Sequence, residues 1–214
     1  MRVRHERVGV VHPQRRSIGE PQRASGERGA GLVELSLVAL LLFTLLAGTF
    51  DYGFGWRSGL AANEGVRTGA RVGSSAGRER GADYVALSGM KAALSASGLL
   101  DGVQRVVVFR ASSEDGSVPA GCKTGSGPNC QVIDGNQFRT NWEALTVESA
   151  TTDSGCLHIA SHQAWCPTTR NTAQATAEFY GVWVQVRHDY LFPIIGDDVL
   201  IERSAVMRIE PEVN

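Results

Sequence analysis

The sequence has almost no net charge. Its 21 Lys and Arg residues against 22 Asp and Glu residues give a formal net charge of -1. A chain without an excess of positive charge has no general attraction for phosphate backbones, so nucleic acid is not an expected partner. No internal repeat is visible either, and the 214 residues are enough for one modest domain plus an anchor.

Residues 1–29 lack hydrophobic periodicity. Arginines outnumber acidic residues in this stretch, and prolines and glycines are scattered among them. We predict that it forms a disordered basic leader on the cytoplasmic side of a membrane. Beyond Glu34 acidic residues outnumber basic ones, which indicates that the two parts of the chain occupy different compartments.

Residues 30–50 form an apolar run without a polar face, AGLVELSLVALLLFTLLAGTF. As a helix it spans about 30 Å, the thickness of a bilayer core. Its length and lack of a polar face argue against a buried core helix. A secretory signal peptide usually has a shorter apolar region of about 7–15 residues, and no clear cleavage site precedes Tyr52. We predict a single-pass span of the inner (plasma) membrane, with the arginine-rich side in the cytoplasm and the C-terminus outside.

Residues 51–98 are rich in glycine and alanine and are predicted to be helical. Five glycines recur at every fourth position, where a helix would present them as one flat ridge for a close neighbour: Gly65, Gly69, Gly73, Gly77 and Gly81. Glycine also weakens a helix, so we expect the first helix to fray beyond Ser74. A second helix is predicted from Asp83 to Ser97, with Gly98 as its stop signal.

Residues 99–214 change to a β pattern. Val103–Arg110 is rich in β-branched residues, and the sequence alternates over Tyr180–Tyr190 and Leu200–Ile209, with a connection marked by Pro193 and Gly196. The two alternating runs predict an antiparallel pair. The expected fold class is α+β: a long N-terminal transmembrane helix, a short second helix and a small, mainly antiparallel sheet with a disulfide-stapled loop at 112–170.

The chain contains four cysteines, all beyond the apolar run: Cys122, Cys130, Cys156 and Cys166. An even number of cysteines in an exported domain predicts two disulfides, which three connectivities could satisfy. Reduced thiols in a cytosolic protein are the alternative, and the charge bias across the span argues against it.

Two patterns resemble enzyme sites, and each has a simpler structural interpretation. Ser75 sits in a Gly-Ser-Ser-Ala-Gly sequence that matches a nucleophile elbow, but the elbow needs a strand before the serine, and a Gly/Ala helix is expected there. His158 and His162 lie between Cys156 and Cys166, a set that could bind zinc. The spacing is tight, and an oxidising compartment favours a disulfide. We therefore expect no catalytic residue, no metal and no cofactor.

The most specific motif is Gly29-Ala30-Gly31-Leu32-Val33-Glu34. Glycine before a scissile bond lets the backbone enter a protease cleft, so Gly29 and Ala30 are predicted to flank a processing site. Glu34 would then be the fifth mature residue. A carboxylate in an apolar run costs a few kcal/mol unless it is paired. We expect Glu34 to pair with a mature N-terminal amine, often that of a neighbouring subunit; the alternative is a glutamate that snorkels at the membrane edge.

The run GERGAGLVELSLVALLLFTLLAGTFDYG and the following AANEGVRTGAR resemble TadE-like proteins of tight-adherence (Tad/Flp) pilus systems. The C-terminal GVWVQVRHDY, LFPIIG and RIEP also fit, so the resemblance covers about 26–75 and 178–211. Leu35 is a departure, since many members carry an aromatic residue there. The resemblance implies a pseudopilin-like component, cleaved by a prepilin peptidase. Its partners would be that peptidase, other pilins or pseudopilins, the Tad membrane platform and membrane lipid.

Two other functions remain open from the sequence. One is an uncleaved, membrane-anchored binding or adhesion module with the same topology. The other is a metal-binding or hydrolase domain on the same anchor.

Overall fold

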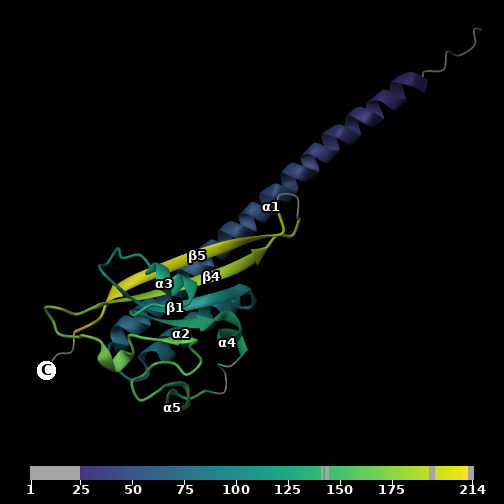
Figure 1. Ribbon diagram of the computed structural model, residues 1–214. Helices are drawn as coiled ribbons and strands as arrows, with labels where there is room; N and C mark the ends of the chain where they lie inside the picture. The colour runs from purple at the N-terminus through teal and green to yellow at the C-terminus, as the bar shows by residue number, and fades with distance from the viewer. Residues whose placement is uncertain (1–24, 141, 143–144, 193–195, 212–214) are drawn as a thin grey trace, which may run out of the picture. The chain divides into compact units, whose positions relative to one another are not determined.

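The computed structural model describes residues 25–140, 142, 145–192 and 196–211. The chain divides into two compact units, Met1–Phe43 and Thr44–Asn214. The helices are α1 (Ser25–Ala76), α2 (Ala82–Ala96), α3 (Ala120–Thr124), α4 (Gly135–Thr140) and α5 (Val147–Ala150), with 3-10 turns η1 (Leu100–Gly102) and η2 (Pro167–Thr169). The strands are β1 (Val103–Ala111), β2 (Cys130–Asp134), β3 (His162–Gln163), β4 (Phe179–Asp189) and β5 (Asp198–Arg208) (Figure 1).

The strands of the described chain form one antiparallel sheet with the order β3-β2-β1-β4-β5. The two long strands β4 and β5 pair over their whole length, from Phe179 opposite Arg208 to Asp189 opposite Asp198. The predicted antiparallel pair and the α+β fold class are therefore confirmed. The predicted connection at Pro193 lies outside the described residues.

The sheet has an apolar core on each face. On one face, alternate valines of β1 and β4 pack with α2, α4 and the part of α1 around Val66. On the other face, Trp183 and Phe109 pack with Val118 and with Cys122 and Cys130, which join α3 to the start of β2. Figure 1 shows α2 and α3 on opposite sides of the strands. The alternation predicted for β4 is confirmed, since Val182, Val184 and Val186 share one core while Trp183 faces the other.

The ridge glycines within α1 lie where other elements pack closely against the helix. A Cβ atom added to Gly69 would lie 3.5 Å from the carbonyl oxygen of Ala86 in α2, and one added to Gly65 would lie 3.1 Å from the Leu94 side chain. A Cβ atom added to Gly73 would lie only 2.2 Å from ring atoms of Tyr180 in β4. The expectation that another backbone approaches this ridge is therefore confirmed at Gly69, whereas Gly77 and Gly81 lie beyond the end of α1 and are not part of a helical ridge.

The ends of the helices follow their glycines. Gly77 adopts φ +56°, a left-handed conformation that a residue with a Cβ adopts only with strain, and α1 ends at the preceding residue. Gly98 adopts φ +75° just after α2, as its predicted role as a stop signal requires. At its other end α1 begins at Ser25, inside the segment predicted as leader. Residues 1–24 of that leader lie outside the described residues.

The cysteine-bearing segment 112–170 contains more regular structure than its composition indicates. It carries β2, which pairs with β1 from Asp134 opposite Arg105 to Cys130 opposite Phe109, together with three short helices and β3. The strand β2 has only five residues and lies between turn-forming residues, so its sequence carries little signal of its own. Its pairing with β1 depends on a distant segment of the chain.

Gly73→Ala should destabilise the domain, because no space exists for a methyl group against Tyr180. Overpacking of this kind costs about 1–3 kcal/mol. Gly53→Ala is the matched control on the same helix, since a Cβ there meets nothing within 4 Å. It should leave stability unchanged or raise it by up to about 1 kcal/mol through helix propensity. Urea unfolding of the full chain in detergent, followed by near-ultraviolet circular dichroism, measures both; equal effects would contradict the packing role of Gly73.

Candidate functional site: the apolar segment of α1 and its junction

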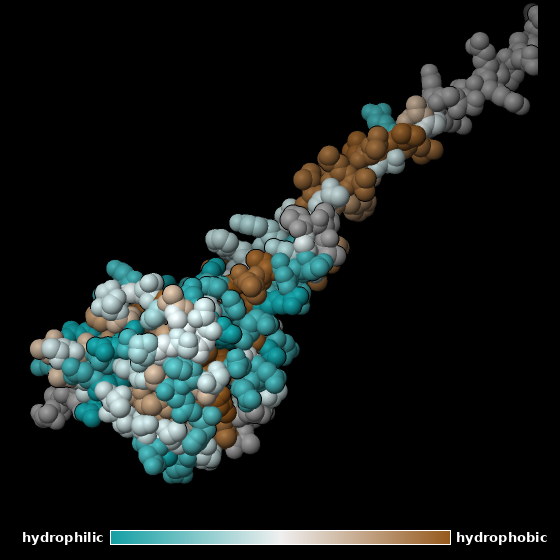
Figure 2. Space-filling model, in the orientation of Figure 1, coloured by the Kyte–Doolittle hydropathy of each residue, from teal (hydrophilic) through white to brown (hydrophobic). Residues whose placement is uncertain are grey.

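The apolar segment of α1 exposes hydrophobic side chains around its whole circumference. Between Leu32 and Phe50 the large side chains are more than two-fifths exposed: Leu32, Val33, Leu35, Leu37, Val38, Leu40, Leu41, Leu42, Phe43, Leu45, Leu46 and Phe50. Figure 2 shows them as a hydrophobic stretch along the helix. The helix is long and apolar enough to cross a membrane. Water solvates such a surface poorly, whereas lipid tails solvate it on all sides.

The hydroxyl groups of this segment fit a lipid environment. Ser36 donates its hydroxyl to the Val33 carbonyl oxygen at 2.7 Å, and Thr49 donates to Leu45 at 2.8 Å. Bonds of this kind satisfy polar side chains within the helix itself, without water.

Glu34 is the ionisable side chain of the apolar run, and it is exposed. Among the described residues it forms no hydrogen bond or ion pair. A charged carboxylate at the centre of a bilayer costs about 3 kcal/mol on insertion scales, and less near the edge. Within the part of the chain that the structure describes, Glu34 thus lacks a partner that would offset this cost.

The predicted processing junction lies within the helix. Gly29 and Ala30 are both exposed residues of α1, and a Cβ on Gly29 or on Gly31 would meet nothing within 4 Å. In the helix Ala30 and Glu34 lie one turn apart on the same face. Cleavage at this junction remains a prediction.

The four cysteines pair as Cys122–Cys130 and Cys156–Cys166, and the described chain has no free cysteine. This is one of the three connectivities that the sequence left open. The second disulfide closes the segment that contains His158 and His162. Its sulfurs are therefore not available as thiolate ligands, which removes half of the zinc set considered as an alternative.

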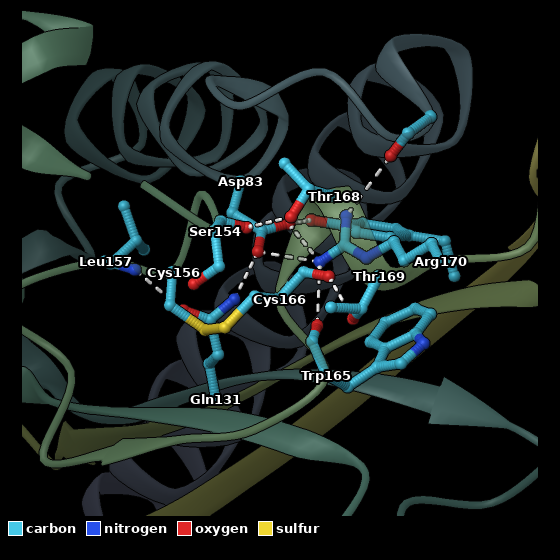
Figure 3. A network of polar contacts seen from close by, with 12 residues as sticks. Asp83, Gln131, Ser154, Cys156, Leu157, Trp165, Cys166, Thr168, Thr169 and Arg170 are labelled. Atoms are coloured by element: carbon cyan, nitrogen blue, oxygen red, sulfur yellow. Dashed lines mark hydrogen bonds and ion pairs between the residues drawn. A yellow bond between two sulfur atoms is a disulfide. The ribbon is translucent and has the colours of Figure 1, made fainter. Parts of the chain in front are cut away.

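Beside the second disulfide lies a buried ion pair that the sequence did not reveal. Asp83 at the start of α2 and Arg170 after η2 are both fully buried, and Arg170 Nη2 lies 2.7 Å from each carboxylate oxygen. The side-chain amide of Gln131 in β2 also donates to Asp83, while its oxygen accepts the Leu157 N–H at 2.8 Å. Figure 3 shows these groups converging on Asp83 next to the Cys156–Cys166 bond.

Aromatic rings complete the surroundings of this pair. The Arg170 guanidinium lies 4.2 Å from the centre of the Trp165 ring and 4.9 Å from that of Tyr180. The Tyr180 hydroxyl donates to Asp83 at 3.0 Å. Burial raises the pKa of Tyr180 well above its ordinary value, and the Asp83 charge adds to this rise while Arg170 opposes it. Tyr180 therefore remains a protonated donor, and the network fastens the disulfide-closed segment to α2 and the sheet.

The nucleophile-elbow pattern does not have the required geometry. Ser75 lies near the end of α1, and its hydroxyl donates to the Val72 carbonyl oxygen of the same helix at 3.0 Å. A nucleophile elbow needs the serine on a sharp turn between a strand and a helix. The helical position of Ser75 therefore gives no support to a hydrolase.

Residues 29–71 match the family model described as TadE-like protein. This segment of the chain is similar to TadE-like proteins. The match starts at the glycine of the predicted junction and includes Glu34, the apolar run and the sequence AANEGVRTGAR, so it confirms the resemblance over that stretch. The resemblance of 178–211 lies outside the match and stays a prediction. No curated protein and no solved structure matches the chain.

Arg170→Met should cost about 3–5 kcal/mol of unfolding free energy, because it leaves the Asp83 charge buried without its cation. Adding Asp83→Asn removes that charge, so the double variant should be more stable than the sum of the single effects. Arg110→Met is the matched control: Arg110 pairs with Glu178 at 3.2 Å but is about half exposed, and its loss should cost less than about 1 kcal/mol. Equal losses for Arg170→Met and Arg110→Met in the same unfolding assay would contradict this role of the buried pair.

Proposed function

We propose that the protein is a pseudopilin-like, membrane-anchored component of a Tad-type pilus assembly or secretion system, made as a precursor and cut by a prepilin peptidase between Gly29 and Ala30. The main support for this proposal is that the TadE-like match begins at Gly29 and continues through the whole apolar segment. In this proposal the domain beyond Phe50 lies outside the cytoplasm, where its two disulfides are stable.

The backbone around the junction supports processing. A protease binds an extended chain, so the first turns of α1 have to unwind before cleavage. Glycine disfavours a helix by roughly 1 kcal/mol relative to alanine. Gly29 and Gly31 flank Ala30, and neither packs against another residue, so local unwinding here is inexpensive.

Cleavage would supply a partner that Glu34 does not have among the described residues. Cutting after Gly29 leaves an ammonium group on Ala30, one helical turn from the carboxylate of Glu34. The two charges could pair within one helix or between neighbouring subunits, and either arrangement reduces the cost of holding both in lipid. Assembly is then favoured by packing between helices whose opposite charges are paired.

Processing is tested with Gly29→Leu in a host that contains the prepilin peptidase. This variant should accumulate as the full-length precursor, because a leucine side chain obstructs the cleft. Gly48→Leu makes the same change on the same helix at a position where a Cβ also meets nothing, and it should be cleaved normally. Mass spectrometry of the N-terminus should find Ala30 in the wild type. Stable wild-type protein that retains Met1 would favour the uncleaved binding module instead.

Glu34→Gln separates membrane insertion from assembly. A neutral amide is cheaper to bury than a carboxylate, so the protein should be at least as abundant in the membrane fraction as the wild type. Surface pili should nevertheless fall by about tenfold if the lost pair contributes about 1.4 kcal/mol. Glu64→Gln makes the same change at an exposed position of α1 beyond the apolar run and should leave pili unchanged. Normal pili in a Glu34→Gln strain with cleaved, abundant protein would leave Glu34 as a residue at the membrane edge.

A further inference from the structure

The connection between β4 and β5 is fastened to α1 at Asp51. The Asp51 carboxylate is buried and accepts the backbone N–H groups of Leu191 at 2.9 Å and of Phe192 at 3.2 Å. Two turns further along α1, the Ser58 hydroxyl lies 3.2 Å from Nδ1 of His188 in β4. All of these residues belong to the 44–214 unit. Two contacts on one face of the helix therefore hold the end of β4 and the residues after it in place.

The position of Asp51 along α1 sets the height of this connection relative to a membrane. The apolar run ends at Phe50, and its 21 residues span about 31 Å at 1.5 Å per residue. That length matches the hydrocarbon core, so Asp51 is the first residue on the outer side of the span. This step depends on the membrane anchoring proposed above, but not on cleavage at Gly29. The backbone N–H groups of Leu191 and Phe192 are hydrogen-bonded to the Asp51 carboxylate, so both residues lie at the same height above the membrane as Asp51.

The side chains at this height are apolar and exposed. Leu191 is 64% exposed and Phe192 45%, while their backbone N–H groups are occupied by Asp51. On α1, Tyr52 and Trp56 are 71% and 63% exposed, and their rings stack with centroids 6.4 Å apart. Tryptophan and tyrosine concentrate at membrane–water interfaces, where a ring can be in the apolar region while its polar atom reaches water.

The charges nearby indicate what kind of contact this surface can make. Arg187 lies 3.2 Å from Asp189 and also pairs with Asp198, while Asp197 is exposed. Arg187 beside the connection is thus already paired with acidic groups, whereas Arg57 of α1 is exposed and directly follows Trp56. Exposed charges of both signs flank the apolar side chains, so the attraction to the bilayer is argued from the apolar side chains and not from charge.

We propose that Leu191 and Phe192 insert into the outer interface of the membrane beside Tyr52 and Trp56. The sheet domain then has a second attachment to the bilayer besides the transmembrane helix. The attachment is hydrophobic and shallow, and Asp51 presents it by binding the two backbone N–H groups. It should not require anionic lipid and should be insensitive to salt, since screening weakens only charge interactions.

Nitroxide accessibility in the full chain tests this proposal. Leu191→Cys is labelled after reconstitution at one copy per nanodisc of zwitterionic lipid; the native cysteines, all in disulfides, do not react. Collisions with oxygen, which partitions into lipid, are compared with collisions with a water-soluble nickel chelate. Leu40→Cys in the apolar run and Val85→Cys, an exposed position of α2, are the two references. The oxygen-to-nickel ratio at 191 should shift from the value at 85 towards the value at 40, and should not change with salt.

Three results would overturn the proposal in distinguishable ways. A ratio at 191 equal to that at 85, with residue 40 in lipid, would mean that the helix spans the membrane while the connection stays in water. A residue 40 accessible to nickel would remove the membrane anchoring itself, and the proposed function with it. A third arm uses several copies per disc. If residue 191 becomes shielded only there, a second copy of the chain covers the surface, and the lipid contact is wrong.

Discussion

The helix α1 has to be stable in two different surroundings, and this requirement explains how residues are distributed along it. Residues 30–50 carry leucine, valine and phenylalanine on every side, a surface that hydrocarbon solvates and water does not. After Phe50 the composition turns to glycine and alanine, and Ala62, Val66 and Ala70 are completely buried in the domain core. The helix has no break between these regions. Composition alone therefore divides one continuous helix into a lipid-compatible part and a part that packs inside a domain.

The glycines in this part of α1 stabilise the domain by letting neighbouring elements pack close to the helix backbone, and not by burying apolar side chains of their own. Each glycine costs helix propensity and buries little surface. In return Gly69 lets the backbone of α2 approach, and Gly73 admits the Tyr180 ring. That ring also places the hydroxyl that donates to Asp83. The ridge on α1 and the buried ion pair are thus joined through a single side chain, so a change at either one is expected to disturb the other.

The sequence predicted those elements whose signal is local. The apolar run, the spacing of the glycines and the alternation over β4 and β5 each reside in one segment, and all three are found. The strand β2 is defined by its pairing with β1, which lies outside its own segment. Each disulfide joins cysteines only 8 or 10 residues apart, but four cysteines allow three connectivities, and the composition of the segment does not choose among them. The ion pair is the clearest example: Asp83 and Arg170 are 87 residues apart, and an isolated aspartate near a helix start looks like an ordinary first-turn acid. Only the fold removes both from water.

In the proposed mechanism, processing and assembly are linked by the charge state of one helix. Before cleavage, Ala30 offers only an amide, and the cations near Glu34 along the chain belong to the leader, Arg28 among them. Cleavage removes those cations and places an ammonium group on Ala30, one helical turn from Glu34. Attraction between opposite charges is strong in a medium of low dielectric, so this ammonium group would favour packing against the Glu34 side chain of the same helix or of a neighbour. In this proposal, removal of the leader thus replaces a group of cations before the apolar run with a single cation at its first residue.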